Sequence, residues 1–517
     1  MSAIITDQLR IVNARNFVSI ASSTSSSYYA FVGLSNPDDY QEDWDSNPPS
    51  PKDSFDEEND YWDTMFSLKK ISPSDIRSVV RKVMWESGTT YDMYRHDISR
   101  DNLSLPSRTT SLYSANYYVV NSEYKVYICI HNGTDPENLS GKPSLDEPNF
   151  TDLEPRSAGD SEDGYLWKYL YTIKPADIIK FESTNFIPVP TNWETNSEYV
   201  DIKNNAVTSG QLKVAVIKNR GVGLGTANRS YTNVPIYGDG SGAKATVTIN
   251  NNSKLENVTI TNGGSNYTYA TLDLRSAGIP LGSTPAVVDI IIPPKNGHGY
   301  DIYRELGAYN VAVYARMENS VDNPDFIVGN KISRVGIIKD PLSYDTDSIL
   351  NIDKASACYA LKLVGIGYSQ TTFTPNSLIT QTIGTGITAV GRVVSYDKET
   401  GVLKYWQDRS LVGFNTDKTK KTNPDYGFVL RQFTPEISSG GSLNIIGGST
   451  VLGIDTVFTG ITTIINNKTY YLGQSFFNGV STPEVSKYSG DIIYVDNRPS
   501  ITRSKNQKED IKVILQF

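Results

Sequence analysis

Three histidines and two cysteines are the side chains best suited to metal binding or covalent chemistry. His96, His131 and His298 have no metal-ligand spacing to another histidine, a cysteine or an acidic pair. Cys129 and Cys358 both lie in apolar runs, which predicts buried thiols and no disulfide framework. The chain also lacks the nucleophile-elbow, Walker, zinc-protease and dinucleotide motifs. A pair of carboxylates brought together by folding, as in glycosidases, stays open. We predict a non-enzymatic protein without cofactor, with no catalytic, cofactor-binding or metal-ligating residue.

Two further segments have a composition that suggests ligand binding. Gly221–Gly225 (GVGLG) resembles a phosphate-binding loop, but no Walker lysine and no helix follow it, which favours a hairpin loop. Asp38–Asp63 contains eleven acidic residues against the single Lys52. Because it lacks EF-hand spacing and is broken by prolines, we expect a solvated loop rather than a metal site.

The composition sets limits on the elements that could position such residues. The chain has 517 residues, of which 38% are hydrophobic, with 33 Tyr and 39 Gly, and this is typical of a mainly β protein. At roughly 150 residues per domain, about three domains are expected. The net charge of −9 argues against nucleic-acid binding. No apolar run approaches the ~18 residues of a membrane span, and the N-terminus lacks a signal-peptide pattern. We expect a soluble protein made in the cytoplasm.

The N-terminal part predicts one strand and one helix. Tyr28–Leu34 is apolar and β-branched or aromatic, as in a strand. Ser72 suits a helix N-cap, followed by Pro73 and a capping-box Asp75. Apolar residues then follow at helical spacing until Gly88, so we predict a helix with Arg77, Arg81 and Lys82 on a solvated face.

The next part predicts paired strands with an aromatic face. Tyr117–Val120 and Lys125–Ile130 read as a hairpin around Asn121-Ser122. Four aromatic residues then alternate with other types, which places them on one face of a strand: Tyr165, Trp167, Tyr169 and Tyr171. A packed sheet face is the preferred interpretation, and a glycan platform is the alternative.

Two glycine-rich segments differ in composition from the rest of the chain. Residues 199–297 contain an internal repeat, in which a strand and a glycine turn are followed by a Tyr-Thr pair. The two pairs begin at Tyr231 and Tyr267, so we expect one small β-domain built from two copies of this unit. In residues 344–483, Gly391–Tyr396 and Val402–Trp406 predict a hairpin. We interpret this second segment as another inserted β-domain.

The last residues again have the composition of β-strands. Ile492–Val495 and Ile511–Leu515 are strand candidates, and Asp496–Pro499 between them has turn chemistry. Tyr309–Ala315 and Ser333–Ile338 also predict strands. A terminal strand is usually paired, because free termini fray. We therefore expect the C-terminal strands to complete a sheet begun in the first 200 residues.

Several ordered blocks resemble one family, the baseplate wedge protein of T4-like contractile-tailed bacteriophages (the gene 8 product type). The resemblance covers residues 1–198, 298–343 and 484–517, but neither glycine-rich segment. It is carried by these residues: Asn16-Phe17, Pro48–Asp53, Trp62, Glu162–Tyr171 with Pro175, Val328–Pro341 and Gly490–Pro499.

The resemblance implies a layered β-sandwich core with a few short helices, plus two inserted small β-domains. The core would comprise 1–198, 298–343 and 484–517, and the inserts 199–297 and 344–483. It further implies a structural virion protein of the tail baseplate, assembled in the host cytoplasm. Such a protein forms a homodimer, links neighbouring wedge proteins, and takes part in baseplate assembly and in the rearrangement that triggers tail contraction. It would bind neither nucleic acid nor membrane. A receptor- or glycan-binding tail protein is the alternative.

Overall fold

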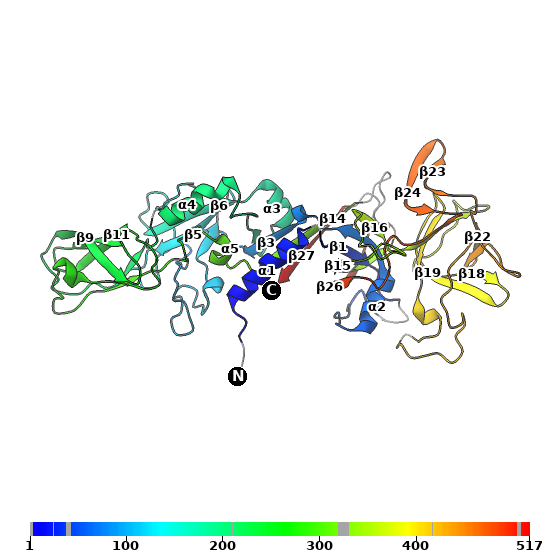
Figure 1. The fold of residues 1–517 in the computed structure, drawn as a ribbon, viewed down its shortest axis with the longest axis horizontal. Helices are drawn as coiled ribbons and strands as arrows, with labels where there is room; N and C mark the ends of the chain where they lie inside the picture. Colours follow the sequence, from blue (N-terminus) through cyan, green and yellow to red (C-terminus); the bar gives the residue numbers. More distant parts are fainter. Residues whose placement is uncertain are drawn as a thin grey trace. The chain divides into compact units, whose positions relative to one another are not determined.

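The protein folds into two compact units, each assembled from distant parts of the chain. The structure is a computed structural model, which describes residues 4–23, 25–37, 43–208, 210–318, 330–415, 417–503 and 508–517. Strands account for 39% and helices for 12% of it, so the predicted mainly β fold with a few short helices is confirmed. Unit 1 comprises Met1–Ser19, Arg77–Val313 and Val513–Phe517, and unit 2 comprises Ile20–Ile76 and Tyr314–Lys512 (Figure 1).

The aromatic stripe forms the centre of unit 1. β4 (Tyr118–Val120), β5 (Lys125–Asn132) and β6 (Tyr165–Thr172) form an antiparallel sheet in that order, and β4 and β5 make the predicted hairpin. In β6, Tyr165 and Trp167 are fully buried on one face and Leu170 is fully buried on the other. The stripe is therefore a packed sheet face.

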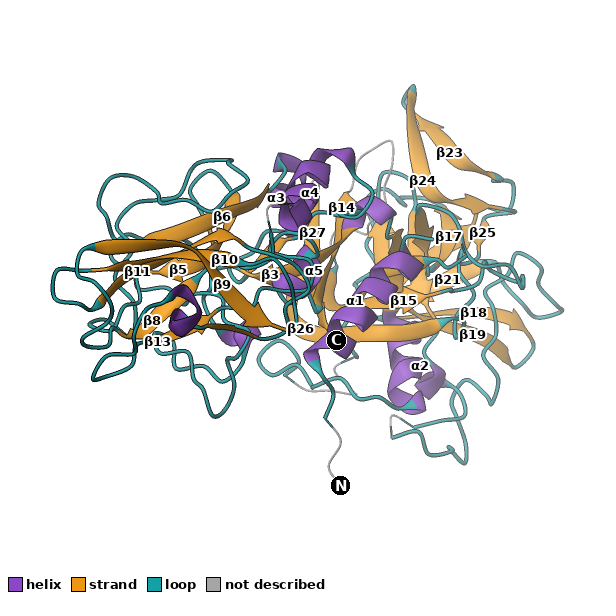
Figure 2. Cartoon of the chain, turned by 60° about the vertical axis from the view of Figure 1, so that its left-hand side comes forward, coloured by secondary structure: helices purple, strands orange, loops and turns teal. Residues whose placement is uncertain are grey.

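Short helices accompany this sheet (Figure 2). They are α1 (Asp7–Ala21), which opens unit 1, then α3 (Pro175–Phe181), α4 (Val200–Thr208) and α5 (Ile302–Glu305). α1 was not predicted from the sequence, because its apolar residues are divided between a buried face and an exposed one. Ile11 and Ala14 are fully buried, whereas Leu9 and Val12 are exposed.

The first glycine-rich segment contributes two sheets to unit 1. β8 (Ala215–Asn219) pairs with β13 (Val287–Ile290). The other sheet has the order β11-β10-β9-β12, with bounds Leu255–Asn262, Lys244–Ile249, Arg229–Gly238 and Ala270–Leu272. Because β12 pairs with β9, the two copies of the sequence repeat meet in one sheet. Residues from Leu212 to Ile292 share one apolar cluster here.

A five-stranded sheet organises unit 2. Its order is β16-β2-β1-β15-β26, with bounds Lys354–Ser356, Met65–Lys70, Tyr28–Gly33, Lys331–Lys339 and Asp491–Thr502. The expected strands at Tyr28 and Ser333 are confirmed as β1 and β15. α2 (Phe55–Thr64) leads directly into β2 and buries Trp62 against this sheet's core. Part of the block from Val328 lies outside the described residues.

The second glycine-rich segment contributes a curled sheet and a separate hairpin to unit 2. The curled sheet has the order β20-β19-β18-β21-β22-β17-β25, and an additional β20–β17 pairing closes it. Its strands are Val402–Trp406, Ile387–Asp397, Leu378–Gly384, Asn444–Gly447, Thr450–Ile454, Tyr359–Val364 and Val480–Ser481. The predicted hairpin is confirmed as β19–β20. β23 (Gly460–Ile465) pairs with β24 (Lys468–Phe476) in a sheet of their own.

The two C-terminal strands join different sheets. β27 (Lys508–Gln516) is the first strand in the order β27-β14-β3-β7, with β14 at Asn310–Glu318, β3 at Ile76–Arg81 and β7 at Phe186–Pro188. β26 is the last strand of the five-stranded sheet. Both sheets contain strands from the first 200 residues, so the C-terminal strands do complete sheets begun there, but two sheets rather than one.

The predicted helix beginning at Ser72 is wrong. The capping box is present, with Asp75 bonded to the Ser72 backbone, but it closes only the 3₁₀ turn Pro73–Asp75. The chain then extends as β3, because its β-branched residues fit a strand and bury against the sheet. Spacing of i, i+3, i+4 does not distinguish these states in so short a run.

The predicted solvated basic face beyond Ser72 is also wrong. Arg77 contacts Asp177 at 3.2 Å, and Lys82 pairs with Glu182. Arg81 donates a hydrogen bond to the carbonyl of Ala115 at 2.8 Å. Each side chain of this group therefore has a protein partner.

The predicted turn at Asp496–Pro499 is wrong as well. β26 continues through it, with Asn497 opposite Arg334 and Ile501 opposite Ile332. The register shifts between these pairs, and Pro499 lies in the irregular stretch, where its missing N–H costs no ladder bond. Turn-forming residues here mark a bulge in an edge strand.

The partition into 1–198, 298–343 and 484–517 as one core, with 199–297 and 344–483 as inserts, stays a prediction.

Candidate interaction site

The acidic segment of the sequence forms α2 rather than only a loop. Asp38–Glu42 lie outside the described residues, but from Ser54 the chain is helical, with the Ser54 hydroxyl accepting a hydrogen bond from the Glu57 N–H at 3.4 Å. Asp56, Glu57 and Glu58 occupy the first turn, where the helix dipole stabilises negative charge. Phe55 is 88% exposed beside them. The predicted solvated loop is therefore wrong for this part of the segment.

The C-terminal end of α2 is held by a buried arginine. Arg334 of β15 donates hydrogen bonds to the Asp60 carbonyl at 3.3 Å and to the Thr64 hydroxyl. It also donates to the side-chain oxygens of Asn497 at 2.8 Å and Asn36 at 3.2 Å. Burial lowers the pKa of Arg334 to about 10. The guanidinium therefore joins α2 to β15 and β26 through neutral acceptors.

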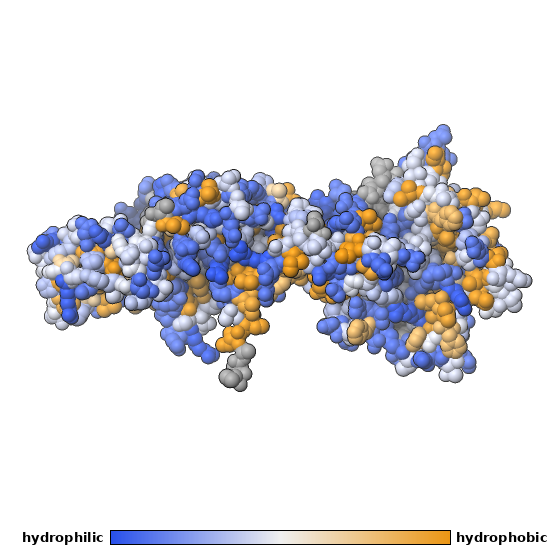
Figure 3. Space-filling view, in the orientation of Figure 1, coloured by the Kyte–Doolittle hydropathy of each residue, from blue (hydrophilic) through white to orange (hydrophobic). Residues whose placement is uncertain are grey.

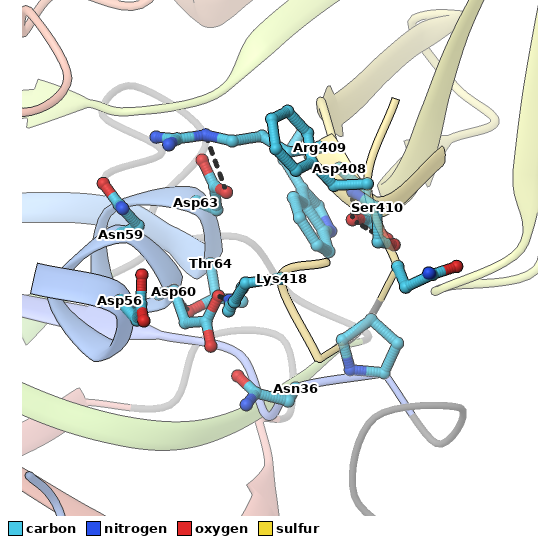
Figure 4. A pocket seen from close by; sticks show the side chains of 14 residues that line it. Asn36, Asp56, Asn59, Asp60, Asp63, Thr64, Asp408, Arg409, Ser410 and Lys418 are labelled. Carbon is cyan, nitrogen blue, oxygen red and sulfur yellow. Dashed lines mark hydrogen bonds and ion pairs between the residues drawn. The ribbon is translucent and has the colours of Figure 1, made fainter. Parts of the chain in front are cut away.

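A cavity of about 250 Å³ opens beside α2 within unit 2. Two ion pairs cross its lining: Lys418 with Asp60, and Arg409 Nε with Asp63 Oδ2 at 3.5 Å (Figure 4). Asp56 and Asn59 also face it, as Figure 4 shows. The described lining residues include neither histidine nor cysteine. The lining also holds Ser410, whose hydroxyl donates a hydrogen bond to Asp408 Oδ1 at 2.7 Å. Its charged and polar side chains are those of a polar contact surface.

Asp63 anchors a second cluster at the end of α2. Its carboxylate accepts a hydrogen bond from the Tyr488 hydroxyl, and Lys487 Nζ donates to its backbone carbonyl at 3.3 Å. The Arg409 guanidinium lies 4.0 Å from the Tyr488 ring centroid. Burial raises the pKa of Asp63 and lowers the pKa of Lys487. The cluster fixes α2 in place and leaves its N-terminal turn as the exposed end.

The three histidines lie in separate surroundings. His298 Nδ1 is 2.6 Å from Glu305 Oε1, and both side chains are buried. His131 is half-buried, and desolvation lowers its pKa. His96 Nδ1 accepts a hydrogen bond from the Ile292 N–H at 3.2 Å. Within the described ranges, no group of three or more His, Cys, Asp or Glu side chains could hold a metal ion.

The other residues considered for chemistry lie inside the fold. Cys129 and Cys358 are free and buried, as predicted, and burial raises the pKa of both thiols, which makes them poor nucleophiles. Gly221–Gly225 forms a loop between β8 and β9 that buries Leu224 and exposes Val222. The predicted hairpin loop is wrong, because β8 and β9 belong to different sheets and Val222 instead bridges to Thr284. Among the described helices, none is long and apolar enough to cross a membrane.

Apolar side chains are exposed at the start of α1. Ile4 is 84% and Ile5 66% exposed, and Leu9 and Val12 continue the stripe at helical spacing. Figure 3 shows this hydrophobic group on the N-terminal end of α1. Contiguous exposed apolar residues of this kind are typical of contact surfaces. Sequence reasoning missed this stripe because it missed the helix.

Comparison with known proteins relates the N-terminal part of the chain to a family. No curated protein matches the chain. Residues 3–152 match the family Phage-Gp8, described as bacteriophage T4 Gp8. The matched range contains α1, α2 and the β4–β5 hairpin. This match supports a structural protein of the phage virion, a baseplate wedge protein of the gene 8 type located in the tail baseplate.

Proposed function

We propose that this chain links neighbouring wedge proteins in the baseplate, and takes part in baseplate assembly and in the rearrangement that triggers tail contraction. The match of residues 3–152 to Phage-Gp8 carries the proposal. The exposed ends of α1 and α2 support it, because each presents groups suited to a protein partner on a firmly packed element. The protein acts without turnover of a substrate.

We further propose that the protein is a homodimer. Two-fold dimers are the commonest symmetric assemblies. A stable contact should bury on the order of 1,200 Å² or more in total, with an apolar centre and a charged rim. Light scattering of the purified full chain tests this, and a clean monomer at micromolar concentration would contradict it.

The N-terminal turn of α2 is our candidate contact for a basic surface of a neighbouring wedge protein. Asp56, Glu57 and Glu58 supply the negative charge, and Phe55 supplies an exposed apolar group beside it. The opposite end of α2 is fixed by Arg334, so this turn is presented in one orientation.

A charge-reversal experiment tests this contact. The variant Asp56→Lys/Glu57→Lys/Glu58→Lys should lower incorporation into baseplates, measured by complementing a phage that lacks the gene and quantifying the chain in purified tails. The control reverses Asp160 and Glu162, which are exposed acidic residues in unit 1. The neutral variant Asp56→Asn/Glu57→Gln/Glu58→Gln removes the negative charge without adding positive charge. It therefore separates the loss of attraction from the repulsion and the helix destabilisation that lysines would introduce. Unaltered incorporation of the lysine variant would remove α2 from the interface.

A further inference from the structure

The β23–β24 hairpin forms a sheet of only two strands in unit 2 (Figures 1 and 2). Asn466 and Asn467 close it with φ angles of 52° and 62°, the conformation of a tight two-residue hairpin turn. A two-stranded sheet is marginally stable alone in water, and three or more strands are needed for independent stability. β24 is held by Leu472 and Phe476, which pack with Ala360 and Val402 of the curled sheet. The strand whose order would increase with a further neighbour is therefore β23.

The outer edge of β23 lacks the usual protection against pairing. Gly460–Ile465 contains no charged residue and no proline, and Ile464 is 72% exposed. Among the described strands, β23 pairs with β24 alone. By contrast, the edge strand β26 carries Arg498 and Pro499 in an irregular stretch, and β27 carries four charged residues. Natural proteins use such charges, prolines and bulges to prevent edge pairing. β23 has neither charge nor proline, and the one irregularity of its pairing lies at its start, between Gly460 and Thr462.

The pairing register indicates which backbone groups are free on that edge. Ile465 pairs with Lys468 and Thr463 with Tyr470. With a two-residue turn, the closing pair is hydrogen-bonded, and hydrogen-bonded and non-hydrogen-bonded positions then alternate along the strand. Thr463 and Ile465 therefore direct their backbone groups towards β24. Thr462 and Ile464 direct theirs outward, and both of these residues are exposed.

We propose that β23 pairs antiparallel with β23 of a second copy of this chain, with Thr463 opposite Thr463 at the two-fold axis. In this register Thr462 of each copy lies opposite Ile464 of the other, so the outward backbone groups meet. Ile461 lies opposite Ile465, which covers apolar side chains on the same face. The product is a four-stranded sheet, β24-β23-β23-β24. The inference rests on the proposed self-association and names its contact.

The sequence of β23 favours β23 of a second copy as its pairing partner. Its five residues from Ile461 to Ile465 are β-branched, and pairing them about Thr463 places isoleucine or threonine opposite isoleucine or threonine throughout. Cross-strand pairs of β-branched residues stabilise a sheet. An uncharged strand offers no charge pattern that would select a different partner, whereas self-pairing requires none.

Cysteine cross-linking in the full chain tests this register. Residues at a non-hydrogen-bonded pair lie about 4.5 Å apart at Cα, within disulfide range. Thr463→Cys should therefore give a disulfide-linked dimer under mild oxidation, reversed by reductant. Thr469→Cys is the matched control, because Thr469 is an exposed threonine on β24, two strand spacings further from its counterpart. The native cysteines are buried and do not compete. Equal cross-linking of both variants, or of neither, overturns the proposal.

A second variant separates this contact from dimerisation itself. Ile464→Lys places a charge on the free edge and should lower the mass measured by light scattering from dimer to monomer. Ile366→Lys, at another exposed isoleucine of unit 2, should leave the dimer intact. If Ile464→Lys stays dimeric and Thr463→Cys does not cross-link, the homodimer stands and the hairpin contact is wrong. If the unmodified chain is monomeric and Thr463→Cys does not cross-link, both are wrong.

Discussion

The Arg334 guanidinium lies 4.9 Å from the ring centroid of Tyr61, and both side chains are buried. Trp44 lies on the same guanidinium at 5.3 Å. Its hydrogen-bond acceptors are amide, hydroxyl and carbonyl oxygens, so the charge is stabilised by dipoles and ring faces. A planar group with donors in a fixed fork fits this site, whereas an ammonium would not.

Replacing Arg334 should therefore destabilise unit 2. Arg334→Lys keeps the charge but leaves some of the acceptors on Asn497, Asn36 and Thr64 without a donor. We expect a loss of about 2–4 kcal/mol, measured as the shift in urea unfolding of the full chain. Arg334→Met should cost a similar amount, because the same acceptors lose their donors.

The matched control is Arg498→Lys, at an arginine whose side chain is 60% exposed on the neighbouring strand. It should change the free energy of unfolding by less than about 0.5 kcal/mol. Equal stability of Arg334→Lys and the unmodified chain would show that the fork geometry is not required.

Much of this fold could be predicted from the sequence, and the exceptions have physical reasons. The β6 stripe and the β19–β20 hairpin followed from period-2 patterning and turn chemistry. The helix expected after Ser72 failed because short β-branched runs fit both helical and extended spacing. α2 was missed since its acidic first turn looks solvated. Its last residues are buried by tertiary contacts with Arg334, with the five-stranded sheet and with Tyr488. No sequence signal marks that arginine, because its partners come from four distant segments.

Lys168 should make stability depend on pH in the alkaline range. It is buried and donates hydrogen bonds to the Leu153 carbonyl and, at 2.8 Å, to Asn205 Oδ1. Burial lowers its pKa from 10.5 to about 8. Between pH 8 and 10.5 the unfolded chain therefore binds more protons than the folded chain, so this contribution to stability rises with pH and is flat below pH 8.

The measurement is the difference in free energy of unfolding between the unmodified chain and Lys168→Met. Between pH 8 and 10.5, the free energy of unfolding of the unmodified chain should increase by about 3 kcal/mol relative to that of Lys168→Met. A flat profile for Lys168→Met would mean that the buried ammonium titrates at an ordinary pH.

The predicted insert 199–297 can be tested by excision at a position that the strand pairing defines. Asn219 of β8 lies opposite Val287 of β13, so residues 220–286 can be replaced by an Asn-Gly turn that keeps this pair. The excision removes apolar residues that pack on Ile217 and Ile290, so both are changed to threonine to avoid exposing apolar side chains. We expect a soluble chain with cooperative urea unfolding. The control is a deletion of equal length within residues 92–164. If the excised chain aggregates and the control deletion aggregates no more than it does, the predicted partition is wrong.

The last strand should be required for folding. The sequence predicts an apolar face of Ile511, Val513 and Leu515. Ile511 and Val513 are buried and Lys512 is exposed, as this alternation requires, but Ile514 and Leu515 are both half-buried. Burying each apolar side chain contributes about 1.5–3 kcal/mol, as an upper estimate. A domain has only about 5–15 kcal/mol in total. Truncation after Asp510 also leaves β14 with an unpaired edge, so we expect insoluble protein.

Point variants separate the lost packing from the lost backbone pairing. Ile511→Thr/Val513→Thr keeps the strand and should lower the melting temperature substantially, whereas Lys512→Thr/Gln516→Thr alters only exposed positions and should melt like the unmodified chain. Differential scanning fluorimetry of the soluble variants measures both. A truncated chain that stays soluble with unchanged melting would show that β27 contributes no stability.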